Sequence, residues 1–308
     1  MKITYSFLVL LLFLPALVSG QQLPLVTQTD GAELFINPAQ WNDGYLRYQQ
    51  NTTVSALYRY QWAGLEDAPR TALATLEHFN EYNNVLISGS IVHDRTGPTG
   101  LNGIYGRFAY HIEMDEAWSA LLGVSGGIAQ YRVDAGELEF LEADDIAQNN
   151  ASRLLPDIGI GATLYYRRSD RNFYLGVAVP QSLGFNLNYT TDQNDFSIRR
   201  LRHFHATGGA QFLLNDDSWL MASVWSKYIP NVPFHLDMNL RYEYRERFWL
   251  GFGGSLARAL HLETGVIANP GYDWSYLRFG YAFNHFFSDF GPNFGSVHEL
   301  KVSYTWDR

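Results

Sequence analysis

The stretch Pro233–Tyr244, PFHLDMNLRYEY, alternates apolar and polar residues without a break. The apolar positions are Phe234, Leu236, Met238, Leu240, Tyr242 and Tyr244, and the polar positions between them are His235, Asp237, Asn239, Arg241 and Glu243. Successive side chains of a β-strand point to opposite faces, so this strand has one apolar face and one polar face. Such a strand fits a half-buried soluble sheet, and equally a membrane barrel with its apolar face in lipid. The rest of the chain distinguishes the two.

The first twenty residues have the features of a secretory signal peptide. Lys2 is followed by the apolar run Phe7–Leu17 and by the small residues Val18-Ser19-Gly20 before Gln21. This run is too short to cross a membrane, and no second run of about 18 apolar residues follows it. We therefore expect residues 1–20 to be cleaved on export and the mature chain to have no transmembrane helix.

Composition narrows the class further. Aromatic residues make up 16% of the 308 residues, yet mean hydropathy is only −0.18. Barrels combine these values because lipid-facing and lumen-facing residues alternate along each strand and cancel in the average. The absence of cysteine excludes disulfides and thiolate metal sites, and the net charge of −9 argues against nucleic acid as a partner.

Strand signals continue from residue 51 to the end of the chain. We predict fourteen strands, at 51–62, 70–79, 84–93, 103–113, 117–132, 156–167, 172–179, 203–213, 218–228, 233–244, 247–256, 260–268, 275–284 and 297–306. The turns after even-numbered strands are short and polar, such as Asn80–Asn83 and Arg245–Glu246. Most connections after odd-numbered strands are longer, such as Asp94–Asn102, Val133–Leu155 and Pro180–Arg202. This asymmetry and the even strand count predict an antiparallel up-and-down outer-membrane β-barrel with both termini in the periplasm.

A fourteen-stranded barrel encloses a lumen too wide for the wall side chains alone to fill. Residues 21–50, which show no sustained periodicity, and the long loops are the candidates to occupy it. We therefore divide the chain into a signal peptide (1–20), an N-terminal segment that could plug the lumen or lie beneath it (21–50), and the barrel (51–308). The polar strand faces carry charges of both signs, which favours ion-paired filling over an open channel. His235, Asp237, Arg241 and Glu243 are predicted to face the lumen.

Several motifs resemble the PorP/SprF family of type IX secretion system membrane proteins. The chain has Asn37-Pro38-Ala39, then the block Leu57–Gly64 (LYRYQWAG), which runs into Ala68-Pro69-Arg70-Thr71. Further matches follow in the family's order: His93-Asp94-Arg95-Thr96-Gly97-Pro98, Ala129-Gln130-Tyr131-Arg132, Lys227-Tyr228-Ile229-Pro230 and Ser296-Val297-His298-Glu299-Leu300. The resemblance implies an outer-membrane barrel that works with other type IX components, either in secretion or in anchoring surface proteins such as gliding adhesins. The alternative is a passive porin for small solutes.

Two groups of motif residues are candidates for binding a partner. Arg59, Gln61, Trp62 and Arg70 could form a surface that holds a partner or a plug, or they could be a lumen ion pair and an interfacial aromatic belt. Asp94, Arg95, Gly97 and Pro98 are placed in the second surface loop, where Gly and Pro first indicate a turn.

We predict neither an enzyme nor a cofactor site. The acidic loop Asp134–Asp145 lacks the EF-hand spacing for calcium and reads better as a short amphipathic helix. His203 and His205 share one strand face, but a third metal ligand is not identifiable. No Gly-x-Ser-x-Gly elbow or cysteine marks a nucleophile.

Overall fold

The computed structural model describes residues 26–133, 151–183, 186–190, 195–199, 201–256, 258–270, 275–287 and 295–307. The predicted signal peptide and the acidic loop Asp134–Asp145 lie outside these residues.

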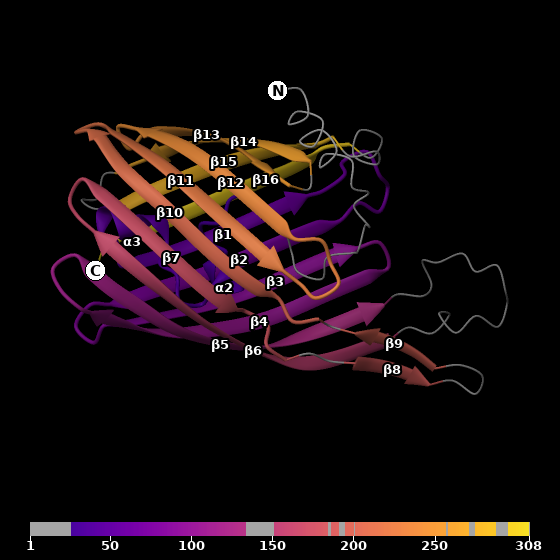
Figure 1. Ribbon diagram of the computed structural model, residues 1–308. Coiled ribbons are helices and arrows are strands. Elements are labelled where there is room, and N and C mark those ends of the chain that lie inside the picture. Colours follow the sequence, from indigo (N-terminus) through magenta and orange to yellow (C-terminus); the bar gives the residue numbers. More distant parts are fainter. Residues whose placement is uncertain are drawn as a thin grey trace, which may run out of the picture.

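Fourteen antiparallel strands form a closed barrel in the order β1-β16-β15-β14-β13-β12-β11-β10-β7-β6-β5-β4-β3-β2 (Figure 1). The strands of its first half are β1 (Thr52–Tyr60), β2 (Arg70–Asn80), β3 (Val85–Thr96), β4 (Thr99–Glu113), β5 (Trp118–Val133), β6 (Ala151–Arg167) and β7 (Arg171–Val179). Those of its second half are β10 (Phe204–Asn215), β11 (Ser218–Tyr228), β12 (His235–Tyr244), β13 (Phe248–Ser255), β14 (Ala259–Ala268), β15 (Ser275–Phe286) and β16 (Val297–Trp306). The predicted fold class is confirmed.

The barrel closes where its first strand pairs with its last. β1 and β16 are in register from Thr52↔Trp306 to Tyr60↔His298. Closure matters because a backbone N–H or C=O exposed to lipid has no water to bond, and a closed sheet leaves no such edge.

Strand β12 shows how the two faces are used. Met238 and Leu240 point outward, with 54% and 47% of their surface exposed, whereas His235 and Glu243 point inward and are buried. The exposed apolar side chains of the outward face run around the barrel, from Val54 on β1 to Val302 on β16. An apolar outer face and a polar inner face are the arrangement of a membrane barrel.

The predicted second surface loop, Asp94–Asn102, is wrong. β3 continues to Thr96 and β4 begins at Thr99, so only Gly97 and Pro98 connect them, and Asp94 and Arg95 lie in β3. Gly97 adopts a positive φ of 53°, which lets two strands reverse within so few residues. Gly and Pro indicated the centre of a loop, whereas the β3–β4 ladder continues up to both residues.

Three other boundaries differ. β1 ends at Tyr60, so Gln61 and Trp62 lie beyond it, and Trp62 takes a positive φ of 56° that ends the strand. β6 begins at Ala151, which shortens the connection predicted at Val133–Leu155. The predicted connection Pro180–Arg202 contains two strands, β8 (Asn186–Thr190) and β9 (Asp195–Arg199), which pair with each other and project beyond the barrel end (Figure 1).

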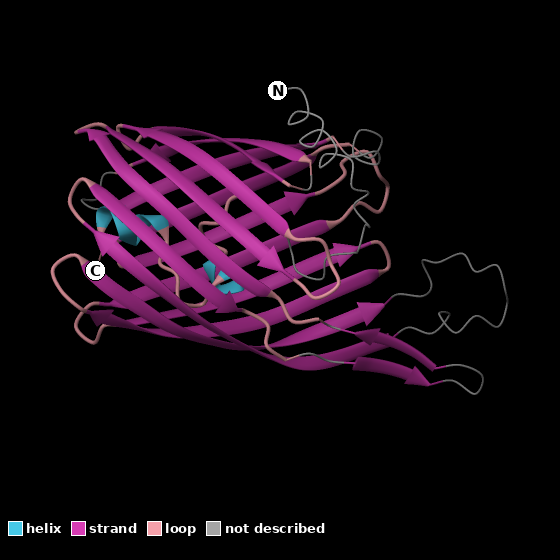
Figure 2. Cartoon of the chain, in the orientation of Figure 1, coloured by secondary structure: helices cyan, strands magenta, loops and turns pink. Residues whose placement is uncertain are grey.

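Residues 26–50, here called the lumen segment, lie inside the barrel (Figure 2). The segment contains two short helices, α2 (Glu33–Ile36) and α3 (Asp43–Tyr48). Asn42 caps α3 by accepting a hydrogen bond from the Tyr45 backbone N–H, and Gln49 ends it in a left-handed conformation. Among the described residues, no helix is long and apolar enough to cross a membrane.

Candidate functional site

The lumen segment follows the barrel axis from one end to the other. Its first residues bond to Asn284 and Glu299, near the end of the barrel that carries the longer connections. Its last residue, Gln50, accepts a hydrogen bond from Thr305, close to the end with short turns. The chain then leaves the lumen at that end and begins β1. The candidate site is the interface between this segment and the wall.

Glu299 anchors the beginning of the segment. Its carboxylate accepts hydrogen bonds from the backbone N–H groups of Thr27 (3.0 Å) and Gln28 (2.7 Å) and from Arg59 Nη1 (3.1 Å). Arg59 also donates to Thr27 Oγ1 at 2.9 Å. Glu299 is fully buried and its pair with Arg59 is desolvated, so loss of either charge would leave the other unpaired in the interior. Arg59 of the YRYQW motif therefore holds the lumen segment.

Asn37 and Pro38 occupy a recess made by three inward-facing glycines. A Cβ added to Gly123, Gly161 or Gly176 would come closer than 3.0 Å to atoms of these two residues, a distance that Cβ atoms essentially never show. Asn37 Nδ2 donates to Thr163 Oγ1, and its Oδ1 accepts from the Ala39 N–H, both at 2.9 Å. The Asn-Pro-Ala motif thus packs against the bare backbone of β5, β6 and β7.

Apolar side chains of the segment pack against apolar residues of the inner wall. Trp41 and Tyr45 contact Phe79, with ring centroids 5.7 and 4.7 Å from it. Leu34 lies in a second cluster with Leu57, the one residue that breaks the apolar–polar alternation of β1. Inward-facing apolar residues of the wall, such as Leu57 and Phe79, therefore belong to the clusters in which the segment packs.

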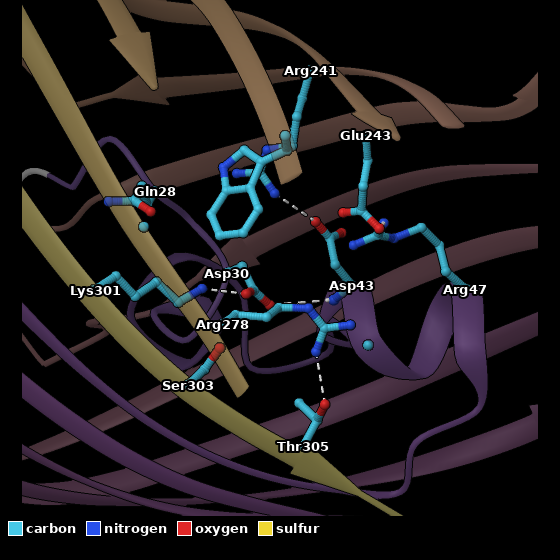
Figure 3. Close-up of a pocket in the computed structure, with 13 residues that line it drawn as sticks. Gln28, Asp30, Asp43, Arg47, Arg241, Glu243, Arg278, Lys301, Ser303 and Thr305 are labelled. Carbon is cyan, nitrogen blue, oxygen red and sulfur yellow. Dashed lines mark hydrogen bonds and ion pairs between the residues drawn. The ribbon is translucent and has the colours of Figure 1, made fainter. Parts of the chain in front are cut away.

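Charged groups also bond the segment to the wall (Figure 3). Asp30 forms an ion pair with Lys301. Asp43 accepts from Arg241 Nη1 at 3.3 Å, and Arg241 also donates to Glu263 at 2.8 Å. Close by, Glu243 accepts from Arg47 at 2.7 Å and from the Tyr48 hydroxyl at 2.5 Å. Deeper in the same lumen, Arg107 pairs with Glu77 and donates to the Gln40 carbonyl at 2.8 Å.

Two carboxyl groups of the segment titrate abnormally. Burial, followed by the nearby charge of Asp30, raises the pKa of Glu33 to about 7. Burial alone would also raise the pKa of Asp30, but its contact with the Lys301 ammonium outweighs this and lowers it below the ordinary range. The shifted pKa of Glu33 therefore lies near neutrality, whereas the shift at Asp30 favours the carboxylate.

Two small cavities lie between the segment and the wall. A cavity of about 20 Å³ lies beside Asp30, Arg47 and Arg278, and another of about 10 Å³ lies beside Phe35 and Trp225. Cavities of this size hold about one water molecule each.

The remaining candidate residues are placed as follows. Pro69, Arg70, Asp94, Arg95, Gly97 and Pro98 lie at the mouth with the longer connections, where the Thr71 hydroxyl bonds Asp94. His235 and Asp237 form a hydrogen-bonded pair on the inner face of the barrel, near the same mouth. His205 Nδ1 donates a hydrogen bond to the Ile36 carbonyl at 2.8 Å, and no group of three potential metal-ligating side chains occurs in the described residues.

A family model described as "Type IX secretion system membrane protein PorP/SprF" matches residues 18–304, nearly the whole chain. The chain belongs to the PorP/SprF family. The resemblance seen in the sequence motifs is confirmed. A search of curated proteins found no significant match.

Solved structures of similar fold are outer-membrane transporters and channels. The P. putida toluene transporter TodX aligns with a TM-score of 0.56 and 9% identity, covering 91% of this chain and 94% of its own. The Ralstonia pickettii toluene transporter TbuX gives 0.56 and 11%, covering 90% and 93%, and the CymD monoaromatic hydrocarbon channel gives 0.56 and 11%, covering 93% and 95%. At such low identity the likeness establishes the barrel fold alone. Fold and family together place this chain among outer-membrane proteins of type IX secretion.

Sequence reasoning missed the wall residues that receive the segment, above all Gly123, Gly161 and Gly176. A usable signal was present, because glycine at inward-facing positions of a strand often marks close approach by another backbone. Leu57, an apolar residue on a polar face, was a second signal for the same interface.

Proposed function

We propose that this chain is a non-enzymatic scaffold of the type IX secretion system, which assists the secretion of partner proteins or their assembly and anchoring at the cell surface. Gliding adhesins are candidates for these partners. Membership of the PorP/SprF family supports the secretion system. The single observation that favours a scaffold over a channel is the lumen segment, which is bonded to the wall along its length.

In this proposal the lumen segment is a plug. The buried side chains of the segment would have to leave their wall contacts together to open a solute path, because polar anchors alternate with packed apolar clusters. Partner proteins would instead be contacted from outside the lumen. The longer connections, including the β8–β9 hairpin, would face the cell surface, and the short turns and the end of β16 would face the periplasm.

Deletion of the gene tests the scaffold. We expect particular secreted or surface-attached proteins to disappear from the surface fraction, as measured by quantitative mass spectrometry, while entry of small dyes and antibiotics is unchanged. Reduced entry with an intact surface proteome would overturn the proposal in favour of a porin.

Conductance provides the complementary test. The purified full-length barrel in a planar lipid bilayer should show no large, long-lived open steps. A steady conductance of porin size would contradict the plug, and a pull-down in mild detergent would then identify whether a protein partner exists at all.

A further inference from the structure

A cavity of about 20 Å³ lies between the lumen segment and strands β12, β13, β15 and β16 (Figure 3). Within the described part of the chain, five of the residues that line it have buried side-chain atoms with no hydrogen-bond partner: Gln28 Nε2, Arg47 Nε, Trp249 Nε1, Arg278 Nε and Nη2, and Ser303 Oγ. All five side chains are buried. An unbonded buried donor is costly, and several around one cavity indicate a ligand that accepts hydrogen bonds from more than one side.

Arg278 is the central group of this cluster. Its Nη1 donates to Thr305 Oγ1 at 2.7 Å, and its guanidinium carbon lies 5.7 and 5.4 Å from the ring centroids of Tyr48 and Tyr276. These contacts fix the side chain but supply no negative charge. Among the described residues, no carboxylate oxygen lies within 4.0 Å of its guanidinium nitrogens.

The other cations that line the cavity are each paired with a carboxylate. Arg47 bonds Glu243, Lys301 bonds Asp30, and Arg241 takes both Asp43 and Glu263. Arg241 thus has two carboxylates at contact distance while Arg278 has none. Asp30 and Glu243 act on Arg278 electrostatically, but only from beyond 4.0 Å. A buried guanidinium without a carboxylate at contact distance is unfavourable.

We propose that this cavity binds a small monovalent inorganic anion, chloride in the cell. An anion accepts hydrogen bonds from donors on all sides and neutralises Arg278, whereas a water molecule would satisfy the donors without supplying charge. The cavity has room for about one particle of water size, so sulfate and other polyatomic anions are too large.

The ligands of this site come from both partners of the interface. Gln28 and Arg47 belong to the lumen segment, and Trp249, Arg278 and Ser303 belong to the wall. Binding of the anion therefore stabilises the seated segment against release, whatever the barrel does in secretion.

Bromide locates the site directly. Crystals of the purified full-length barrel grown in sodium bromide should give an anomalous difference peak within hydrogen-bond distance of Arg278 Nη2 and Ser303 Oγ. An ordered water with no anomalous signal would overturn the proposal.

A labelling experiment tests binding in solution. The chain has no cysteine, so Ala39→Cys places a single thiol in the buried segment, and its reaction with maleimide reports release of the segment. When chloride replaces gluconate at constant ionic strength, labelling should slow by the factor 1 + [Cl⁻]/Kd, about threefold at twice the Kd.

Arg278→Gln should abolish this chloride response, and Ser303→Ala should weaken it. Asp217→Asn, which removes an exposed ion pair with Arg245, is the matched control and should keep the full response. If Arg278→Gln does not form the folded barrel, the Ser303→Ala comparison decides. A parent protein indifferent to chloride, or an equal response in the Ser303 variant and the control, would refute the site.

Discussion

Replacement of Glu299 by Gln should release the beginning of the lumen segment. The carboxylate accepts three hydrogen bonds, from two backbone N–H groups and from Arg59. The amide keeps one acceptor oxygen but removes the one carboxylate that, among the described residues, lies within 4.0 Å of Arg59, whose side chain is 5% exposed. Breaking one partner of a buried ion pair costs about 3–5 kcal/mol. The seated state should be destabilised by about that amount.

Thiol labelling converts this free energy into a rate. With Ala39→Cys as the probe, labelling proceeds through the released segment, and each 1.4 kcal/mol corresponds to about tenfold in its population. Glu299→Gln should therefore speed labelling about 100-fold or more, up to the rate of an exposed cysteine.

The matched control is again Asp217→Asn. It removes a carboxylate charge from an ion pair with Arg245 whose two side chains are about half exposed, and such pairs contribute little. Its labelling rate should stay within twofold of the parent. If Glu299→Gln also stayed within twofold, the Glu299–Arg59 anchor would not hold the segment, and the reasoning from buried charge would be refuted.

Three further changes test other parts of the structure. Leu240→Lys should lower the free energy of unfolding from lipid vesicles by about 2–4 kcal/mol if the position lies near the membrane midplane, and Asn239→Lys, on the inward face, by far less; equal losses would reverse the assigned faces. Because the seated state raises the pKa of Glu33 to about 7 from an ordinary 4.5, it holds a proton that the released segment gives up between these values. Thiol labelling, normalised to an exposed cysteine, should accordingly become faster as pH rises from about 5 to 7, and Glu33→Gln should remove that trend; a slope that survives the substitution would assign it to another group. Gly123→Ala should speed labelling because its Cβ collides with the segment backbone, whereas Gly106→Ala, where the nearest atom is 3.7 Å away, should not; similar rates in both would argue against the recess.

The barrel could be predicted because its determinants are local. The inward and outward faces of each strand follow from the alternation of its own residues, and the length of each connection is visible directly in the sequence. Thirteen connections therefore sufficed to place strand ends within a few residues. The failures fall where local signals conflict, as at Gly97-Pro98, where turn residues occur but the ladder continues to both of them.

The lumen segment could not be predicted in the same way. α2 has four residues and α3 has six, too few to show a helical period. Its contacts are also remote in sequence: Thr27 and Glu299 are 272 positions apart. The residues around Thr27 do not indicate that its N–H group bonds to a glutamate on the last strand. Asn37 and Arg59 could therefore be recognised as motif residues, but their roles could not be derived from the sequence.

The direction of the lumen segment has a consequence for biogenesis. Residue 27 lies by Glu299 toward one mouth, and the chain joins β1 at the opposite mouth, inside a sheet sealed by the β1–β16 ladder. A finished cylinder would have to be threaded lengthwise by a chain bearing α2, α3 and the bulky Trp41. If the sheet instead curls around a lumen segment that is already in place, pairing of β1 with β16 closes the barrel around that segment. The topology then implies an order of assembly, in which the lumen segment is in place before β1 pairs with β16. The last strand both closes the barrel and supplies Glu299, the carboxylate that holds the segment.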